Sequence, residues 1–403
     1  MARSDIETLT TLANGSAYGD EMRGAMGTIL ETVDAPAPGP SSGVGGVTLE
    51  SFSGASDDEK LGNAMSWVAA QTYKPPILLL ENREYGSFTT PRDLFSGFKL
   101  LGGAAFSNQY RSALSTPQRV NVNTSGAWLR MPTGNVFDVE ISRLSFYSQS
   151  STTDFLGGHS SGVLWTSVIR DVGFSLFRHV LGSPTTKLLN TALICDGWWN
   201  VNNGRGAAMT VGGSDSTFWP DGILLDSPTT LTAGVVPYHM YFSFQSKSFV
   251  GPMYVTAESE PAAVRITGTT GTSVSGAQLI FHGTRMEGRN ADAPSYGSVI
   301  RMEGGMVTFR DIWASYGFSD PASSGRSSEG GVISVLGGTA LFDGCYYSRA
   351  TGVAEDVPFI YASGQDTKVR VRNTVGVGDW AGLPRVQAAN NASVDTDNSV
   401  TVV

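Results

Sequence analysis

The chain has 403 residues, of which 16% are charged and 49 are glycine, and its formal net charge is −9. So low a charged fraction argues against a helical bundle, and the negative charge argues against nucleic acid as a partner. Frequent glycine, together with Ser, Thr and Asn, is instead typical of a β-rich fold with many tight turns. Because no apolar run reaches roughly 18 residues, we expect no insertion into a membrane.

Residues 1–33 have the strongest helical pattern in the chain. A capping-box candidate occupies residues 4–7. Apolar residues at helical spacing form two short series: Ile6, Leu9; Met22, Met26, Ile29, Leu30. Such short helices need a partner for their apolar stripes, which could be another copy of the chain, the rest of the protein or a host particle. The stretch lacks the apolar core of a signal peptide, which favours assembly in the cytoplasm.

Residues 34–49 are rich in Pro, Gly and Ser, which predicts a linker between two parts of the chain. Residues 50–403 consist mainly of short apolar strands broken by Gly, Asn, Ser and Pro. A β-rich domain of this length indicates a repeat architecture. The alternative is a β-sandwich, but sandwiches space their strands at roughly 8–12 residues and rarely run this long.

Apolar positions recur at the length of one solenoid coil. The steps between them are 28 residues in the first series below and 28, 33 and 29 in the second: Ile141, Ile169; Phe281, Phe309, Phe342, Val371. Strands that recur at such a period, joined by glycine-rich segments, predict the stacked coils of a parallel β-helix.

Residues 52–103 carry the most specific pattern. The run FSGASDDEKL (52–61) leads into a predicted short helix at 61–70, and apolar strands follow at 77–80 and 98–103. Asp57 and Asp58 suit the N-terminal end of that helix, where they face the positive end of its dipole. This arrangement resembles the opening of pectate-lyase-like bacteriophage tailspikes, in which the helix caps the first coil. A cap is needed because an open coil exposes its apolar interior and an unpaired strand edge.

The resemblance covers residues 50–105 well and the rest of the chain by repeat pattern alone. Two motifs depart from the usual family form: GDGxTDD is replaced by FSGASDDEK, and PxGxY by LENREYG. The resemblance implies a right-handed parallel β-helix that forms a homotrimer. It also implies a virion location, with residues 1–33 attaching the spike to baseplate, tail or head proteins.

Tailspike β-helices include both enzymes and plain adhesins, so the resemblance leaves the activity open. We expect a non-enzymatic virion spike that contacts the host surface or decorates the particle. The alternative is a depolymerase that hydrolyses or eliminates host capsular or cell-wall glycan. A free cellular polysaccharide lyase or hydrolase is disfavoured, because the sequence shows no export signal.

Catalytic residues cannot be assigned from the sequence. The four histidines lack the spacing of metal ligands, and no phosphate-binding or nucleophile motif occurs, so we expect no metal and no cofactor. Paired carboxylates would be the leading chemistry, and stacked coils could bring together acids such as Glu287 and Glu303. Cys195 and Cys345 are predicted to be free and buried.

Residues 195–226 hold three of the eight tryptophans together with several acids, in what we interpret as a loop-rich insertion. Sugars stack their C–H faces on aromatic rings while acids and amides bind the hydroxyl groups. The glycan-binding candidates are therefore Asp196, Trp198, Trp199, Trp219 and Asp221. The alternative is that these tryptophans pack between subunits or fill the interior of the β-helix.

Overall fold

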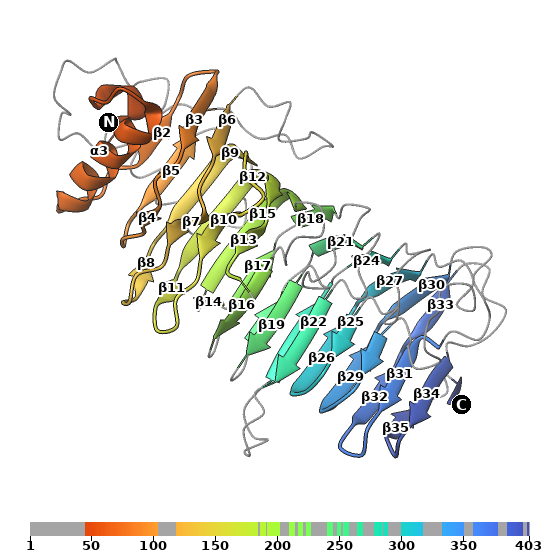
Figure 1. Cartoon of the computed structure of the whole chain (residues 1–403). Coiled ribbons are helices and arrows are strands. Elements are labelled where there is room, and N and C mark those ends of the chain that lie inside the picture. Colours follow the sequence, from red (N-terminus) through yellow and green to blue (C-terminus); the bar gives the residue numbers. More distant parts are fainter. Residues whose placement is uncertain are drawn as a thin grey trace, which may run out of the picture.

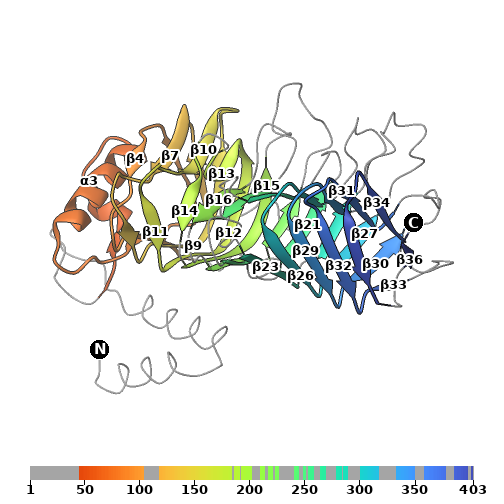
Figure 2. The ribbon, with the colours of Figure 1, turned by 90° about the horizontal axis from the view of Figure 1, so that it is seen from below.

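The computed structural model describes residues 45–103, 118–183, 186–190 and 192–201 of the chain. Further along it describes residues 209–213, 217–220, 223–226, 240–244, 248–250, 253–257, 264–268, 278–283, 285–288, 300–316, 333–349, 358–377, 385–397 and 401–402. These residues form an elongated β-solenoid with helix α3 (Asp57–Ala70) at its N-terminal end (Figure 1). Strands of successive coils lie side by side along the long axis (Figure 2).

In the described residues the first of two sheets contains 21 strands. They are β1 (Val47–Thr48), β2 (Ile77–Leu79), β3 (Glu84–Phe88), β5 (Lys99–Gly102), β6 (Arg119–Val122), β9 (Glu140–Ser148), β12 (Ser167–Phe177), β15 (Ala192–Val201), β17 (Thr217–Pro220), β18 (Ile223–Asp226), β20 (Ser248–Val250), β21 (Met253–Ala257), β23 (Gln278–His282), β24 (Arg285–Gly288), β26 (Met306–Arg310), β27 (Trp313–Tyr316), β29 (Thr339–Asp343), β30 (Tyr346–Arg349), β32 (Lys368–Arg372), β33 (Val375–Val377) and β35 (Ser393–Thr396).

The second sheet contains 15 strands in the same described part of the chain. They are β4 (Arg92–Asp93), β7 (Gly126–Arg130), β8 (Val136–Phe137), β10 (Thr153–Gly157), β11 (Val163–Trp165), β13 (His179–Leu181), β14 (Leu188–Asn190), β16 (Met209–Gly213), β19 (Met240–Phe244), β22 (Val264–Gly268), β25 (Ile300–Met302), β28 (Ile333–Val335), β31 (Ile360–Ser363), β34 (Arg385–Ala389) and β36 (Thr401–Val402). Pairing between successive coils is parallel in both sheets, which confirms the predicted all-β parallel solenoid.

The strand register confirms the coil period predicted from the sequence. Ile141 pairs with Ile169, and Phe281, Phe309, Phe342 and Val371 pair in succession across four coils. The Phe309 and Phe342 rings are stacked with centroids 4.7 Å apart, and all four residues of that series are buried. The repeating apolar residues are therefore the core of the solenoid.

A sharp bend divides each C-terminal coil into a first strand (β23, β26, β29, β32) and a second strand (β24, β27, β30, β33). The residue at the bend has a positive φ: 67° at Gly283, 52° at Asp311, 67° at Gly344 and 51° at Asn373. Glycine tolerates this left-handed conformation best, and Asn and Asp are the next best. The outer faces of the first and second strands consequently point in different directions.

Helix α3 starts at Asp57, four residues before the predicted start at Leu61. The prediction was wrong there because Ser56 is the N-cap: its hydroxyl accepts a hydrogen bond from the Glu59 N–H at 3.2 Å. Three acids in the first turn suit the positive end of the helix dipole. The helix buries Leu61, Ala64, Met65 and Val68 against the first coil, next to the short 3-10 helix η1 (Leu49–Ser51).

Strand β1 lies inside the segment that the sequence predicted to be linker. Val47 and Thr48 pair with Ile77 and Leu78 of β2, and Val47 is buried. Sequence pattern misses this strand because only two residues separate the glycine-rich run from η1. The first coil of the solenoid therefore begins before residue 50.

The Asp58 carboxylate fastens α3 to the first coil. It accepts hydrogen bonds from the backbone N–H groups and hydroxyls of Thr89 and Thr90, at 2.7–3.1 Å, and an Arg92 guanidinium nitrogen lies 2.5 Å from it. The Asp58 and Arg92 side chains are only 9% and 13% exposed. Removing the carboxylate would take this acceptor away from Thr89 and Thr90, and would leave the Arg92 nitrogen with only the Asp58 backbone oxygen.

We therefore expect Asp58→Ala to lower the free energy of unfolding by about 3 kcal/mol, because it leaves a nearly buried cation without its counter-charge and several donors without an acceptor. Urea unfolding followed by circular dichroism would measure this. The matched control is Asp93→Ala, whose carboxylate pairs with Arg130 at 2.8 Å but is 64% exposed. The control should cost at most about 1 kcal/mol. Equal losses in the two variants would contradict the assigned role of Asp58.

Candidate functional site

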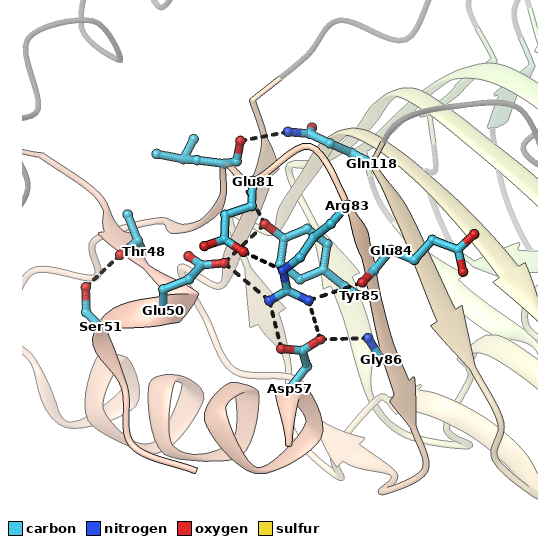
Figure 3. A network of polar contacts seen from close by, with 11 residues as sticks. Thr48, Glu50, Ser51, Asp57, Glu81, Arg83, Glu84, Tyr85, Gly86 and Gln118 are labelled. Carbon is cyan, nitrogen blue, oxygen red and sulfur yellow. Dashed lines mark hydrogen bonds and ion pairs between the residues drawn. The ribbon is translucent and has the colours of Figure 1, made fainter. Parts of the chain in front are cut away.

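Three carboxylates surround Arg83 at the N-terminal end of the solenoid (Figure 3). Asp57 accepts from two guanidinium nitrogens at 2.7 and 2.9 Å, Glu81 accepts from Nε at 2.5 Å, and Glu50 lies 3.5 Å away. The guanidinium also lies over the Tyr85 ring, 4.0 Å from its centroid, and the Tyr85 hydroxyl contacts Glu50 at 3.2 Å. Because several carboxylates lie close together here, this cluster is a candidate for the pair of catalytic carboxyl groups of a glycoside hydrolase.

The charges in this cluster point to a structural role. The hydrogen bond from Arg83 lowers the pKa of Asp57, and its backbone bond from Gly86 acts in the same direction. Burial raises the pKa of Tyr85, which keeps its hydroxyl protonated. Glycoside hydrolysis needs one carboxyl that stays protonated as a general acid, and Asp57 is held ionised instead. We therefore assign the Arg83 cluster to holding α3 and η1 against β3.

The same contacts predict how the cap responds to acid. The pKa values of Asp57 and Asp58 lie below the ordinary value of 3.8; for Asp58 burial opposes this, but hydrogen bonds from Thr90, Arg92 and Thr89 outweigh it. Groups with lowered folded-state pKa values stabilise the fold above their unfolded pKa and lose that contribution as pH falls through the folded value. We expect unfolding stability to drop steeply below about pH 4, and to drop less in Asp58→Asn. Identical pH profiles, measured by thermal unfolding, would contradict this.

The second strands carry a continuous row of residues in register from coil to coil, which we call the aromatic row. Its members are Arg119, Ser145, Gly173, Trp198, Leu224, Tyr254, Arg285, Trp313, Tyr346 and Val375. The row is buried at Ser145 and open at its C-terminal end, where Trp313, Tyr346 and Val375 are 40%, 41% and 48% exposed. The next residue after Tyr346, Tyr347, is buried, as strand alternation requires.

The two exposed rings lie side by side. The centroids of Trp313 and Tyr346 are 5.7 Å apart and their planes make an angle of 23°. The bend residues Asp311, Gly344 and Asn373 each stand two positions before a member of the row. Asp311 Oδ2 lies 3.1 Å from His282 Nε2, and Asn373 Nδ2 donates to Asp343 Oδ1 at 2.9 Å. Exposed aromatic surface and exposed polar groups therefore meet along this edge.

A second row, two residues further along each second strand, is mostly polar; we call it the polar row. Its register positions are Asn121, Tyr147, Ser175, Asn200 and Asp226, then Thr256, Glu287, Ser315, Ser348 and Val377. A row of residues with mainly hydroxyl, amide and carboxylate side chains therefore lies beside the aromatic row in the strand register. This pairing of residue types is the one that binds carbohydrates: rings for C–H faces and polar groups for hydroxyls.

The structure separates the tryptophans that the sequence grouped together. Residues 195–226 were predicted to be a loop-rich insertion, but Trp198 and Trp199 lie on strand β15 and Trp219 lies on β17. Adjacent residues of a strand point to opposite faces. Trp198 belongs to the aromatic row, whereas Trp199 pairs with Phe174, which is buried in the core.

The remaining candidates fall elsewhere. Trp219 pairs with Ile194 on the first strands, so it is not in the aromatic row. Asp196 lies on β15 between two paired stretches, at the point where the register against β12 shifts. Asp221 is outside the described residues. So are the virion-attachment candidates Ile6, Leu9, Met22, Met26, Ile29 and Leu30.

Glu287 and Glu303 do not occupy matching positions in neighbouring coils. Glu287 is on β24 of the first sheet, whereas Glu303 follows β25 of the second sheet. Glu303 instead accepts a hydrogen bond from Arg301 at 2.6 Å. The sequence could not show this because it does not reveal which sheet a strand joins or how the coils align.

Other predictions concern ligands and cysteines. Within the described residues, no group of three or more His, Cys, Asp or Glu side chains is placed to hold a metal ion. The same part of the chain contains no helix long and apolar enough to cross a membrane. Cys195 and Cys345 form no disulfide and are buried, as predicted, and burial raises the pKa of the Cys345 thiol to about 12.

Sequence reasoning missed Trp313 and Tyr346, which are the exposed part of the site. The signal was present, because these residues are 33 positions apart, the same step that separates Phe309 from Phe342. Applying the coil period to outward residues as well as to core residues would have found them.

The strand pairing and the helical cap define this chain as a parallel β-solenoid. Among solved structures it is similar to the Acinetobacter phage vB_ApiP_P1 tailspike protein, with 12% sequence identity and a TM-score of 0.44. The likeness covers 88% of this chain and 60% of that one, so this chain spans less than two thirds of the tailspike's length. No protein-family model and no curated protein sequence matches the chain.

Proposed function

We propose that this chain is a tailspike-like component of a bacteriophage virion, and that it binds a host-surface glycan on its aromatic row without cleaving it. The observation that carries the proposal is the exposed Trp313–Tyr346 pair, in register with further aromatic positions and flanked by the polar row. Large exposed aromatic surface is costly in water unless it serves binding. The polar row contains residue types whose side chains bind sugar hydroxyl groups.

The shape of the site favours an extended polymer. The aromatic positions Trp198, Tyr254, Trp313 and Tyr346 span five coil steps. Neighbouring parallel strands are about 4.8 Å apart, so the span is roughly 24 Å. Only a chain of several sugar units could contact all four positions at once. Capsular and cell-wall glycans have this form.

Virion location, homotrimer formation and attachment through residues 1–33 belong to the same proposal. They derive from the resemblance of residues 52–103 to tailspike openings, with α3 in the capping position that the resemblance implies. Light scattering of the purified chain should give three times the chain mass of 42.6 kDa. A mass equal to one chain would remove the trimer from the proposal.

The alternative is a depolymerase, and one observation favours it. The polar row includes Asp226 on β18 and Glu287 on β24, with β21 between them. Two coil steps separate their backbones by roughly 9.6 Å. Inverting glycosidases hold their two carboxyl groups about 6.5–9.5 Å apart, slightly less than this backbone separation.

The experiment uses an immobilised panel of purified bacterial capsular polysaccharides and O-antigens. Binding of the full chain to one of them, with no new reducing ends or unsaturated products, supports the non-enzymatic spike. Release of oligosaccharide that is lost in Asp226→Asn or Glu287→Gln establishes the depolymerase instead. If the Trp313→Ala and Tyr346→Ala variants still bind the polysaccharide with unchanged affinity, the aromatic row is not the binding site.

A further inference from the structure

A groove of about 280 Å³ lies between α3 and the first strand of the second sheet, β4. Met65, Ser66 and Ala69 of α3 form one wall, and Arg92, Phe95 and Arg130 form the other. The groove is distinct from the aromatic row, because it is at the capped end of the solenoid. None of the contacts of the Arg83 cluster involves these six residues.

The walls combine apolar and cationic groups. Phe95 is half-buried and packs edge-on against Phe98, with centroids 5.5 Å apart. Arg130 is 49% exposed and uses its Nε to bond Asp93 at 2.8 Å. A guanidinium has five N–H donors, so Arg130 can bind a further acceptor in the groove.

Arg92 supplies the second guanidinium group of the groove wall. Its terminal nitrogen pairs with Asp58, but its Nε is buried and has no hydrogen-bond partner among the described residues. Buried donors are normally satisfied, so an unpaired one calls for an explanation. Gly62 keeps the space around this side chain clear, since a Cβ there would lie 2.6 Å from Arg92 Nη1.

We propose that the groove binds residues 20–31 of the same chain. This stretch has Met22, Met26, Ile29 and Leu30 at helical spacing, and its three acids and single Arg23 give it a net charge of −2. An apolar stripe flanked by carboxylates is complementary to a groove that combines Met65 and Phe95 with two guanidinium groups. Of the three partners that the sequence left open, this stripe would then contact the rest of its own chain. The attachment proposed for residues 1–33 would rest on the other series, Ile6 and Leu9.

The connection between the two parts permits this. Strand β1 starts at Val47 and pairs with β2 in the first coil, the coil that α3 covers. Residues 32–44 can span roughly 40 Å when extended. The segment can therefore reach the groove of its own chain without any change in the solenoid.

Cysteine cross-linking in the full chain tests the proposal. Met26→Cys and Ser66→Cys are combined and treated with a short bis-maleimide; Ser66 is exposed on α3. The native Cys195 and Cys345 are buried and should not react. The matched control combines Met26→Cys with Ser393→Cys, an exposed position on β35 at the far end of the solenoid.

We expect an intrachain product from the Met26/Ser66 pair, at least tenfold above the Met26/Ser393 control. Adding Ala69→Glu, which places a negative charge in the groove, should reduce that product at least fivefold. A product that joins two chains would overturn the proposal in favour of a second copy in the groove. Absence of any product, or an unchanged yield with Ala69→Glu, would overturn it altogether.

Discussion

Replacing both Trp313 and Tyr346 by Ala is expected to weaken glycan binding by several hundred-fold. Truncating one central aromatic contact in an interface typically costs about 2 kcal/mol, which is about 30-fold in Kd. The two rings touch, so their losses will not add fully. The measurement is binding of the variant to the capsular polysaccharide or O-antigen that the native chain retains, followed by isothermal titration calorimetry.

The control for this experiment is Met306→Ala. Met306 is 40% exposed, as Trp313 is, but it lies on β26, whose outer face points away from the second strands. Binding should be unchanged in the control, and the thermal midpoint should change little in both proteins because the substituted side chains are partly exposed. If Met306→Ala weakens binding as much as the double variant does, general loss of exposed apolar surface explains the effect and the aromatic row does not.

Replacing Trp128 by Ala is expected to lower the free energy of unfolding by about 3–5 kcal/mol. Trp128 is fully buried and its ring lies 5.6–5.7 Å from those of Phe88, Phe146 and Phe155. Phe88 on β3 and Phe146 on β9 belong to the first sheet, and Trp128 on β7 and Phe155 on β10 belong to the second. The cluster therefore joins both sheets of the solenoid. Its removal leaves a cavity where the first coils pack together.

Urea unfolding followed by far-ultraviolet circular dichroism would measure this loss. This signal is chosen instead of tryptophan fluorescence because the variant removes a tryptophan. Trp165→Ala is the matched control, because Trp165 is 37% exposed and contacts Phe137 at the surface. It should cost about 1 kcal/mol or less. A cost for Trp128→Ala as small as the control's would mean that the aromatic cluster does not hold the two sheets together.

The sequence predicted the fold through its core. Phe281, Phe309 and Phe342 repeat because each coil must fill the same interior position, and that requirement is visible as spacing. Helix α3 was predicted four residues short because its beginning depends on a hydrogen bond to the Ser56 hydroxyl, which carries no periodicity. Strand β1 was missed because its pairing with β2 is a tertiary contact.

The site was less accessible to sequence reasoning. Trp198 and Trp199 are neighbours in sequence, yet they pair with different positions of β12: Trp198 with Gly173 and Trp199 with Phe174. Trp313 and Tyr346 are far apart in sequence, yet the coil period places them in contact. In a solenoid, closeness across the surface follows the register between coils, so candidate residues should be compared one coil apart.

The most direct test of the glycan-binding surface is the dependence of affinity on ligand length. Fragments of the polysaccharide that the chain retains would be prepared at increasing length and titrated against the full protein by calorimetry. Affinity should rise with each added sugar until the fragment reaches roughly 24 Å, the span of the aromatic positions, and then level off. A single sugar or disaccharide that binds as tightly as the polymer would contradict an extended site along the aromatic row.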